Sequence, residues 1–210
     1  MRERLSDSQI EITLARYGLT VSPGLSASIR SYISILLRWN RKISLTTVVE
    51  PLEILKFHFG ESFFASKFIE NPACRLADVG SGAGFPGLAL KIVLPNLQVS
   101  LIEQDTRKAT FLNEVIRLLD LAGVRVHRSP YESLPPEFGN FDFIAARAVG
   151  NHKELLKWAA ARFGPDGQIM LWLGADDAIR VSQLPGWQWH LPHALPNSRN
   201  RILLLGVAAK

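Results

Sequence analysis

Residues 76–90 read LADVGSGAGFPGLAL, and this stretch decides the fold. A short apolar run ends in a loop of glycines and small residues, and apolar residues then return at helical spacing. We interpret 74–79 as a buried strand and 86–94 as a helix that Pro86 opens. Glycines allow the backbone to turn tightly and leave bare amides for a ligand; those of this loop are Gly80, Gly82 and Gly84.

Strands and helices continue to alternate to the end of the chain. Further strands are expected at 98–103, 124–128, 141–146, 168–173, 186–190 and 201–207, and helices at 106–121, 152–162 and 175–183. This alternation predicts an α/β fold whose seven-stranded sheet is mostly parallel and carries helices on both faces. The last strand follows its neighbour with too little chain for a helical crossover, so we expect it to pair antiparallel.

The chain before Asn71-Pro72 has helical patterns only. Apolar residues form one stripe over 25–42, and Ser22-Pro23 is the expected start of that helix. A second helix is expected over 51–69, opened by Pro51. We therefore predict a helical extension over 1–71, packed on a Rossmann-like domain over 72–210.

Composition limits the class of protein. The chain has 210 residues, 47% of them hydrophobic, which suits a domain with a substantial core. The lone Cys74 excludes an intramolecular disulfide framework, and the five histidines show no metal-ligand spacing, so no metal is expected. Without a secretory signal or an apolar window long enough for a membrane span, a soluble cytoplasmic protein is expected. The formal net charge of +5 suits a polyanionic partner.

Two features indicate an adenosyl ligand. Gly82, Gly84 and Gly87 satisfy the G-x-G-x-x-G fingerprint of dinucleotide sites, a weak signal when it stands alone. Glu103 closes the second strand, where a carboxylate can accept hydrogen bonds from both ribose hydroxyls. Because NAD and S-adenosylmethionine both carry that ribose, these features leave the choice between them open.

Asp78 favours S-adenosylmethionine. An ionised side chain in an otherwise apolar strand is costly unless it is satisfied. We expect Asp78 at the carboxyl edge of the sheet beside the ligand, where it would repel a pyrophosphate and attract a sulfonium and an ammonium group. The pattern D-x-G-x-G followed by a ribose-binding acid therefore favours a methyl donor, with an NAD-dependent oxidoreductase as an alternative.

The sequence lacks the usual signals of catalytic side chains. It has no G-x-S-x-G elbow and no N-P-P-Y or D-P-P-Y tetrad of the kind used to methylate exocyclic amines. An acceptor that is already nucleophilic, such as guanine N7 with its free lone pair, needs no general base and relies on proximity and orientation. The sequence permits this mechanism without singling it out.

Several segments together resemble one known family. Across roughly residues 30–175 the chain is similar to the bacterial glucose-inhibited division protein B family, in the segments WNRKISLTTV, FHFGESF, DVGSGAGFPGLALKIVLP, LIEQDTRKATFLNEV and FDFIAARAV. The resemblance implies a class I methyltransferase fold with S-adenosylmethionine as cofactor. It also implies that the acceptor is N7 of a guanosine in 16S rRNA, the one at rRNA position 527.

The resemblance also implies roles for individual residues. By position, the donor pocket would contain Gly80, Phe85, Glu103, Tyr131, Glu132 and Arg147. Glu103 would bind the ribose, and Tyr131 and Glu132 would flank the adenine. Arg147 ends the fourth strand, so its guanidinium would meet the donor carboxylate or an RNA phosphate.

Two positions depart from the family pattern. Pro130-Tyr131-Glu132 replaces the usual R-A-E, and Leu173 stands where the family commonly has a lysine. The role of that lysine is either lost in this chain or taken by Arg180. These departures leave donor binding intact and bear on RNA contacts. His58 and Glu61 match a family segment that we interpret as packing and helix bracing.

Basic clusters are the candidate RNA contacts. They comprise Arg38, Arg41, Lys42, Arg199 and Arg201. The expected partner is 16S rRNA or the 30S subunit, bound by a monomer without a membrane. A methyltransferase with a non-RNA acceptor and a domain that binds the donor without turnover are further alternatives.

Overall fold

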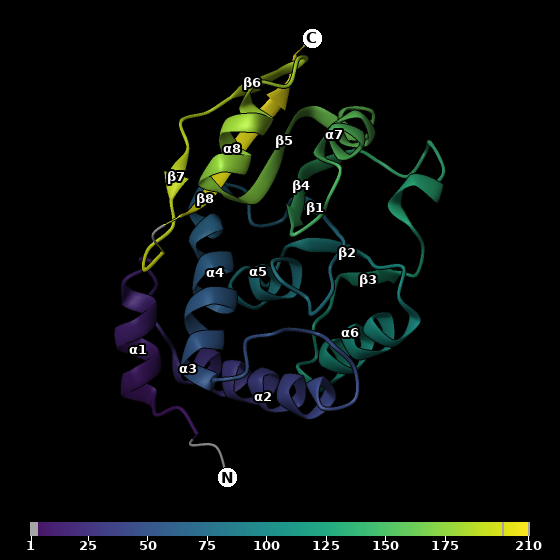
Figure 1. Ribbon diagram of the computed structural model, residues 1–210. Helices are drawn as coiled ribbons and strands as arrows, with labels where there is room; N and C mark the ends of the chain where they lie inside the picture. Colours follow the sequence, from purple (N-terminus) through teal and green to yellow (C-terminus); the bar gives the residue numbers. More distant parts are fainter. Residues whose placement is uncertain (1–3, 199, 210) are drawn as a thin grey trace.

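One mixed sheet organises the molecule (Figure 1). The computed structural model describes residues 4–198 and 200–209. The strands are β1 Arg75–Val79, β2 Gln98–Ile102, β3 Val124–His127, β4 Phe141–Arg147, β5 Phe163–Gly174, β6 Trp187–Trp189, β7 His193–Ala194 and β8 Arg201–Ala208. Their order is β3-β2-β1-β4-β5-β8-β6, and β7 pairs with β8. The first five strands are parallel, and β8 runs antiparallel to β5, β6 and β7, which confirms the prediction for the last strand.

The sheet differs from its prediction at two places. The short strand β7 was not predicted, so the sheet has eight strands. Strand β5 begins at Phe163 and not at residue 168, because Phe163 pairs with Phe141 across an irregularity in the β4–β5 register. Gly164, Pro165 and Gly167 make this first part look like a turn in the sequence.

Side chains of the central strands alternate between two buried layers, as the pleat requires. Phe143 and Ala145 face one layer, whereas Ile144 and Ala146 face the other. Helices α5 Gly87–Val93 and α6 Thr106–Leu118 cover the first face, and α7 His152–Ala160 and α8 Ala175–Ser182 cover the second. No helix in the part of the chain that the structure describes is long and apolar enough to cross a membrane.

The N-terminal extension adds helical elements to the first face of the sheet. They are α1 Asp7–Ala15, α2 Pro23–Asn40, α3 Pro51–Ile54, the π-helix η1 Leu55–Gly60, α4 Glu61–Phe64 and the 3-10 helix η2 Ala65–Phe68. Ser22 caps α2 by accepting from Leu25 N, and Pro23 is in its first turn, as predicted. The helix expected over 51–69 is interrupted by the π-helix, and α1 was not predicted.

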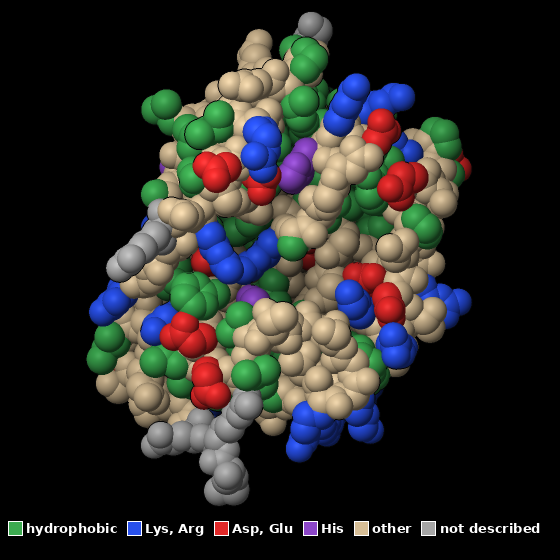
Figure 2. All heavy atoms as spheres, in the orientation of Figure 1, with side chains coloured by type: hydrophobic (Ala, Val, Ile, Leu, Met, Phe, Trp, Pro, Cys, Tyr) green, Lys and Arg blue, Asp and Glu red, His purple; other side chains and the backbone are tan. Residues whose placement is uncertain are grey.

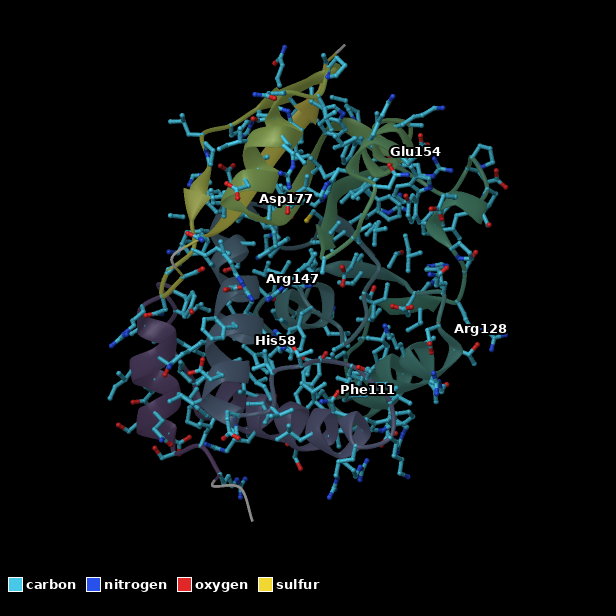
Figure 3. The ribbon with its side chains drawn as sticks, in the orientation of Figure 1. His58, Phe111, Arg128, Arg147, Glu154 and Asp177 are labelled. Carbon is cyan, nitrogen blue, oxygen red and sulfur yellow. The ribbon has the colours of Figure 1, made fainter. Side chains whose placement is uncertain are left out.

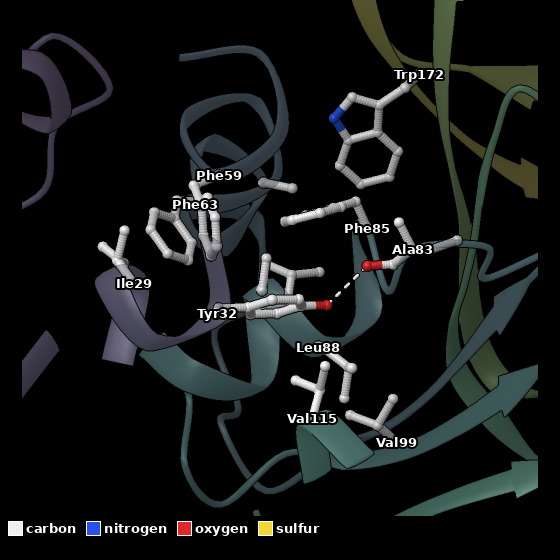
Figure 4. Packing of buried hydrophobic residues seen from close by; sticks show 14 of the residues in the cluster. Ile29, Tyr32, Phe59, Phe63, Ala83, Phe85, Leu88, Val99, Val115 and Trp172 are labelled. Carbon is white, nitrogen blue, oxygen red and sulfur yellow. Dashed lines mark hydrogen bonds between the residues drawn. The ribbon is translucent and has the colours of Figure 1, made fainter. Parts of the chain in front are cut away.

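The extension and the sheet share one hydrophobic core. Tyr32 of α2 is buried among Phe59 of the π-helix, Phe85 after β1 and Phe111 of α6. Its hydroxyl donates to the carbonyl of Ala83 at 2.8 Å, as Figure 4 shows. The extension is therefore packed directly against the glycine loop.

Candidate functional site

A pocket of about 500 Å³ lies at the carboxyl ends of the parallel strands, where open α/β sheets bind ligands. Its walls come from the loops after β1, β2, β3 and β4 and from the N-terminal extension. Figure 2 shows that this face of the molecule is hollowed near its centre. Of the predicted donor-site residues, those that line the pocket are Gly80, Gly82, Phe85, Glu103, Tyr131, Glu132 and Arg147.

The glycine loop turns back onto the end of β2. Gly80 N and Ser81 N both donate to the carbonyl of Ile102, at 2.9 and 3.1 Å. Gly80 has a φ of +70°, and a Cβ added there would lie 2.9 Å from a methyl group of Val149. Glycine is therefore required at this position both by conformation and by space.

Glu103 holds the loop from the neighbouring strand. One carboxylate oxygen accepts from Gly82 N at 2.8 Å and the other accepts from Asp105 N at 2.8 Å. The residue is 6% exposed and lines the pocket. Because a carboxylate has about four acceptor sites, Glu103 can still accept from ligand hydroxyls while it holds both amides.

Asp78 is not on the pocket wall, in contrast to its predicted position beside the ligand. It is fully buried behind the loop, and its Oδ2 accepts from Gly87 N at 2.9 Å, at the start of α5. Burial raises the pKa of this carboxyl to about 7. Asp78 therefore ties strand β1 to helix α5, and direct attraction of a cationic ligand does not follow from its position.

Gly84 also faces away from the pocket. Its φ is +82°, and an added Cβ would lie 2.2 Å from the hydroxyl oxygen of Tyr32. The third glycine of the loop thus makes room for helix α2 and not for a ligand. A glycine that makes room for a helix and a glycine that makes room for a ligand look the same in a sequence, because both positions require a backbone without a side chain.

Tyr131 and Glu132 lie on the wall that follows β3. They belong to the short 3-10 turn η3 Tyr131–Ser133, which Pro130 precedes. The Tyr131 ring packs edge-on against Trp158 of α7, with ring centroids 5.4 Å apart. Burial, with Glu132 nearby, raises the pKa of the Tyr131 hydroxyl to about 12, so this group stays protonated at neutral pH.

Arg147 belongs to a buried ion-pair cluster. Its Nη2 lies 3.0 Å from a carboxylate oxygen of Glu61, and Arg201 Nη1 lies 2.8 Å from the same oxygen. Nη2 also donates to the carbonyl of Phe57, whereas Nη1 is buried without a hydrogen-bond partner among the described residues. Arg147 and His58 both lie near the centre of Figure 3. The cluster joins the extension to strands β4 and β8 beside the pocket.

One wall of the pocket comes from the N-terminal extension and was not predicted from the sequence. Leu45, Thr46 and His58 line the pocket together with the glycine loop. His58 Nε2 lies 2.7 Å from Thr46 Oγ1, and its ring stacks on Phe85 at a centroid distance of 5.0 Å. The signals were the polar SLTT segment between two predicted helices, which is also typical of an ordinary loop, and the match of His58 to a family segment that we interpreted as packing.

The ionisable groups of the pocket suit binding more than proton transfer. Burial, together with the nearby Arg147 and Arg201, lowers the pKa of His58 to about 3, so its ring is neutral and weakly basic at neutral pH. Within residues 4–198 and 200–209, no group of three or more His, Cys, Asp or Glu side chains could hold a metal ion. The lining groups can therefore bind and orient a ligand.

The predicted RNA contacts are divided between two regions. Arg38 and Arg41 line a second groove along α2, together with Arg4 and Arg30, and no Asp or Glu is among its lining residues. Figure 2 shows Lys and Arg side chains gathered at the lower edge of the face, near the end of α2. Lys42 follows that helix and is exposed.

Several of these basic residues have partners within the chain. Arg38 pairs with Glu114 at 2.5 Å while remaining 59% exposed. Arg201 belongs to the Glu61 cluster. Arg199 lies outside the described residues. Leu173 is buried, and the exposed Arg180 pairs with Asp177.

Comparison with known proteins identifies a matching family. The family described as rRNA small subunit methyltransferase G matches residues 25–186. Ribosomal RNA small subunit methyltransferase G of Stenotrophomonas maltophilia strain R551-3 is 33% identical over 180 residues, covering 85% of this chain and 82% of the relative. The protein of the same name from Halorhodospira halophila is 32% identical over 185 residues, covering 88% and 82%.

Solved structures match the fold. The ribosomal protein L11 methylase of Lactobacillus delbrueckii subsp. bulgaricus aligns with a TM-score of 0.62 and 16% identity, over 74% of this chain and 80% of that chain. At that identity the likeness concerns the fold alone. The fold is that of class I S-adenosylmethionine-dependent methyltransferases, as the resemblance in sequence implied.

Proposed function

This chain belongs to the rRNA small subunit methyltransferase G family, and from this premise we propose that it transfers a methyl group from S-adenosylmethionine to 16S rRNA. The observation that carries the proposal is the family match over residues 25–186, which includes every segment that lines the pocket. The pocket, at the carboxyl ends of the strands, has the position that this chemistry needs.

S-adenosylmethionine is the proposed donor, and when bound it supplies a methyl group on a cationic sulfur. The open space beside Gly80 and Gly82, the ribose acceptor Glu103 and the wall at Tyr131 and Glu132 suit an adenosyl ligand. The buried, unpartnered Nη1 of Arg147 suits the carboxylate of its amino-acid moiety. Asp78 acts indirectly in this proposal, by fixing the start of α5.

N7 of a guanosine is the proposed acceptor atom. Its lone pair is available for direct attack on the methyl group, so no proton has to be removed first. The pocket agrees with this chemistry, because its only histidine, His58, is a weak base with a pKa lowered to about 3. Catalysis then rests on holding the acceptor in line with the donor at about 3 Å.

The groove along α2 is the proposed contact for the rRNA backbone. Its arginines are Arg4, Arg30, Arg38 and Arg41, of which Arg30 pairs with Asp7 and Arg38 pairs with Glu114. Lys42 extends this basic surface, and Arg201, beside Glu61, is proposed as a further contact. Arg199, which lies outside the described residues, is proposed as another from the sequence alone. A monomer that works on ribosomal subunits in the cytoplasm is the expected state.

A transfer assay tests the proposed function. The purified full chain is incubated with methyl-labelled S-adenosylmethionine and 30S subunits that lack the modification, and the RNA is digested to nucleosides. We expect label in 16S rRNA, recovered as 7-methylguanosine. Tight donor binding without any label in rRNA would contradict the proposal and return the non-RNA acceptor and the binding-only domain to consideration.

A further inference from the structure

The segment over residues 41–50 contributes lining residues both to the pocket and to the groove along α2. Leu45 and Thr46 line the pocket beside the glycine loop. Arg41 and Val49, from the same segment, line the basic groove along α2. An RNA strand bound along the groove would therefore contact this segment, whose other residues line the pocket.

The segment is held in place by side chains, although it has no regular secondary structure. Asn40 Oδ1 accepts from Leu45 N at 2.8 Å and from Thr46 N at 3.0 Å, and Asn40 Nδ2 donates to Thr46 O at 2.8 Å. Thr46 Oγ1 accepts from Val48 N at 3.0 Å and lies 2.7 Å from His58 Nε2. Such contacts fix a loop in advance of ligand binding, which lowers the entropy cost of ordering it.

His58 braces this segment against the donor side of the pocket. Its ring lies against Phe85, and Phe85 in turn stacks on Tyr32 with ring centroids 5.3 Å apart. A charged histidine would be repelled by Arg147 and Arg201, and burial also favours the neutral ring. The hydrogen bond between Thr46 and His58 thus persists across the neutral pH range.

We propose that Thr46, held by His58 and Asn40, is a positioning residue for the acceptor base, and that segment 41–50 forms the wall against which that base is placed. The inference rests on the proposed function. The loops of the Rossmann-like sheet provide the residues suited to the donor, whereas Leu45, Thr46 and His58 are the lining residues that the extension contributes. Guanine N7 lies on an exposed edge of the base, so the enzyme has to orient the whole base, and a rigid wall keeps that base in line with the methyl group.

The test uses the full chain with two substitutions at one position. Thr46→Val keeps the shape of the side chain and removes both hydroxyl contacts, whereas Thr46→Ser keeps the hydroxyl. Donor affinity is measured by calorimetry, and kcat and KM are measured for methyl transfer to 30S subunits. We expect Thr46→Val to bind the donor within about twofold of the unmodified chain while its kcat falls about 10- to 100-fold, and Thr46→Ser to recover most of that loss.

A second substitution separates positioning from folding. Asn40→Ala releases the same segment from the other side, so it should also lower kcat while the donor affinity stays within about twofold of the unmodified chain. The three lost hydrogen bonds should lower Tm by several degrees, so transfer is measured well below that Tm. Normal transfer by Thr46→Val, or a loss of donor affinity as large as the loss of transfer, would overturn the assignment. Absence of transfer by the unmodified chain would refute the proposed function and, with it, this inference.

Discussion

Two carboxylates beside the glycine loop have different surroundings and therefore different roles. Glu103 keeps both oxygens bonded to backbone amides at the pocket wall. Asp78 is buried behind the loop, and its Oδ1 has no hydrogen-bond partner among the described residues. An acid at a strand end is visible in a sequence, but the direction in which its side chain points depends on the pleat and on the helix packed above it.

Glu103→Gln is expected to weaken donor affinity. The amide group cannot accept at both ends, so one of the amides of Gly82 and Asp105 loses its partner and a ribose hydroxyl loses a charged acceptor. The loss should be about 1 to 3 kcal/mol in binding free energy, measured by calorimetry with S-adenosylmethionine. Glu137→Gln, at an exposed position, is the matched control and should bind normally. Equal affinities for the two variants would place the ribose elsewhere.

Asp78→Asn is expected to change how stability depends on pH. The folded-state pKa of Asp78 is raised to about 7 from 3.8, so the protonated side chain stabilises the fold below pH 4 and this contribution is lost as the pH rises through 7. The asparagine side chain does not titrate, so the variant does not lose this stability as the pH rises. Its free energy of unfolding relative to the unmodified chain should therefore rise between pH 4 and pH 8, on the order of 1 to 4 kcal/mol.

Urea unfolding at several pH values measures this difference. His58 acts in the opposite direction, because its lowered pKa costs stability as the pH falls, but both chains contain it and its effect cancels. A difference between the two chains that is constant with pH would show that Asp78 titrates normally.

At the scale of elements, the N-terminal helices are joined to the sheet by two different kinds of contact. Helix α2 meets the glycine loop through Tyr32, which lies where Gly84 has no side chain. The segment η1–α4 meets β4 and β8 through the ion pairs of Glu61. Tight packing and buried charge thus hold the pocket wall from two sides.

Gly84→Ala should destabilise the protein strongly. The new methyl group would overlap the Tyr32 hydroxyl, and the φ of +82° is unfavourable for alanine. We expect a loss of more than about 2 kcal/mol in the free energy of unfolding. Gly24→Ala is the control, because an added Cβ there lies 3.9 Å from its nearest neighbour and α2 gains helix propensity. Similar stabilities for the two variants would contradict the role given to Gly84.

Glu61→Gln should also destabilise the fold. The side chain of Glu61 is 1% exposed and pairs with Arg147, whose side chain is 14% exposed, so the substitution leaves a buried cation without its counter-ion. The expected cost is about 3 to 5 kcal/mol by denaturant unfolding. Arg180→Ala breaks the exposed pair with Asp177 and should change stability by less than about 0.5 kcal/mol. A small effect at Glu61 would mean that water reaches Arg147.

The whole molecule presents a basic groove and a pocket on either side of one segment. Neither cavity belongs to a single part of the chain: residues of the extension and of the sheet loops meet in the pocket. This arrangement agrees with our proposal that an RNA strand and a small donor bind at neighbouring places.

Arg38→Glu combined with Arg41→Glu should weaken rRNA binding and flatten its dependence on salt. Fewer phosphate contacts release fewer counterions, so the slope of log K against log salt should fall by about 1 to 2. Filter binding over a range of salt concentrations measures both effects. Lys153→Glu combined with Lys157→Glu makes the same charge change at α7, on the opposite face of the sheet, and serves as control. If both double variants lose affinity equally, binding depends on net charge and not on the groove.

The sequence by itself determined most of the order of strands and helices along the chain, the glycine loop and the antiparallel last strand, but not α1 or β7. Each of these depends on local periodicity or on the length of a connection, and both can be read along the chain. The resemblance in five segments also led to the family. Glu103, Gly80 and Arg147, which the sequence predicts as donor-site residues, line the pocket because strand ends in a parallel sheet meet at one edge.

Only the tertiary structure decided whether each residue faces the pocket or a helix packed against the loop. Gly84 and Asp78 belong to the contacts of α2 and α5, and Thr46 and His58 belong to the pocket, because packing between distant segments determines where side chains point. The π-helix at 55–60 and the ion pairs of Glu61 likewise depend on neighbours far away in the sequence. Local patterns describe single elements, whereas a site is formed by the gap between several of them.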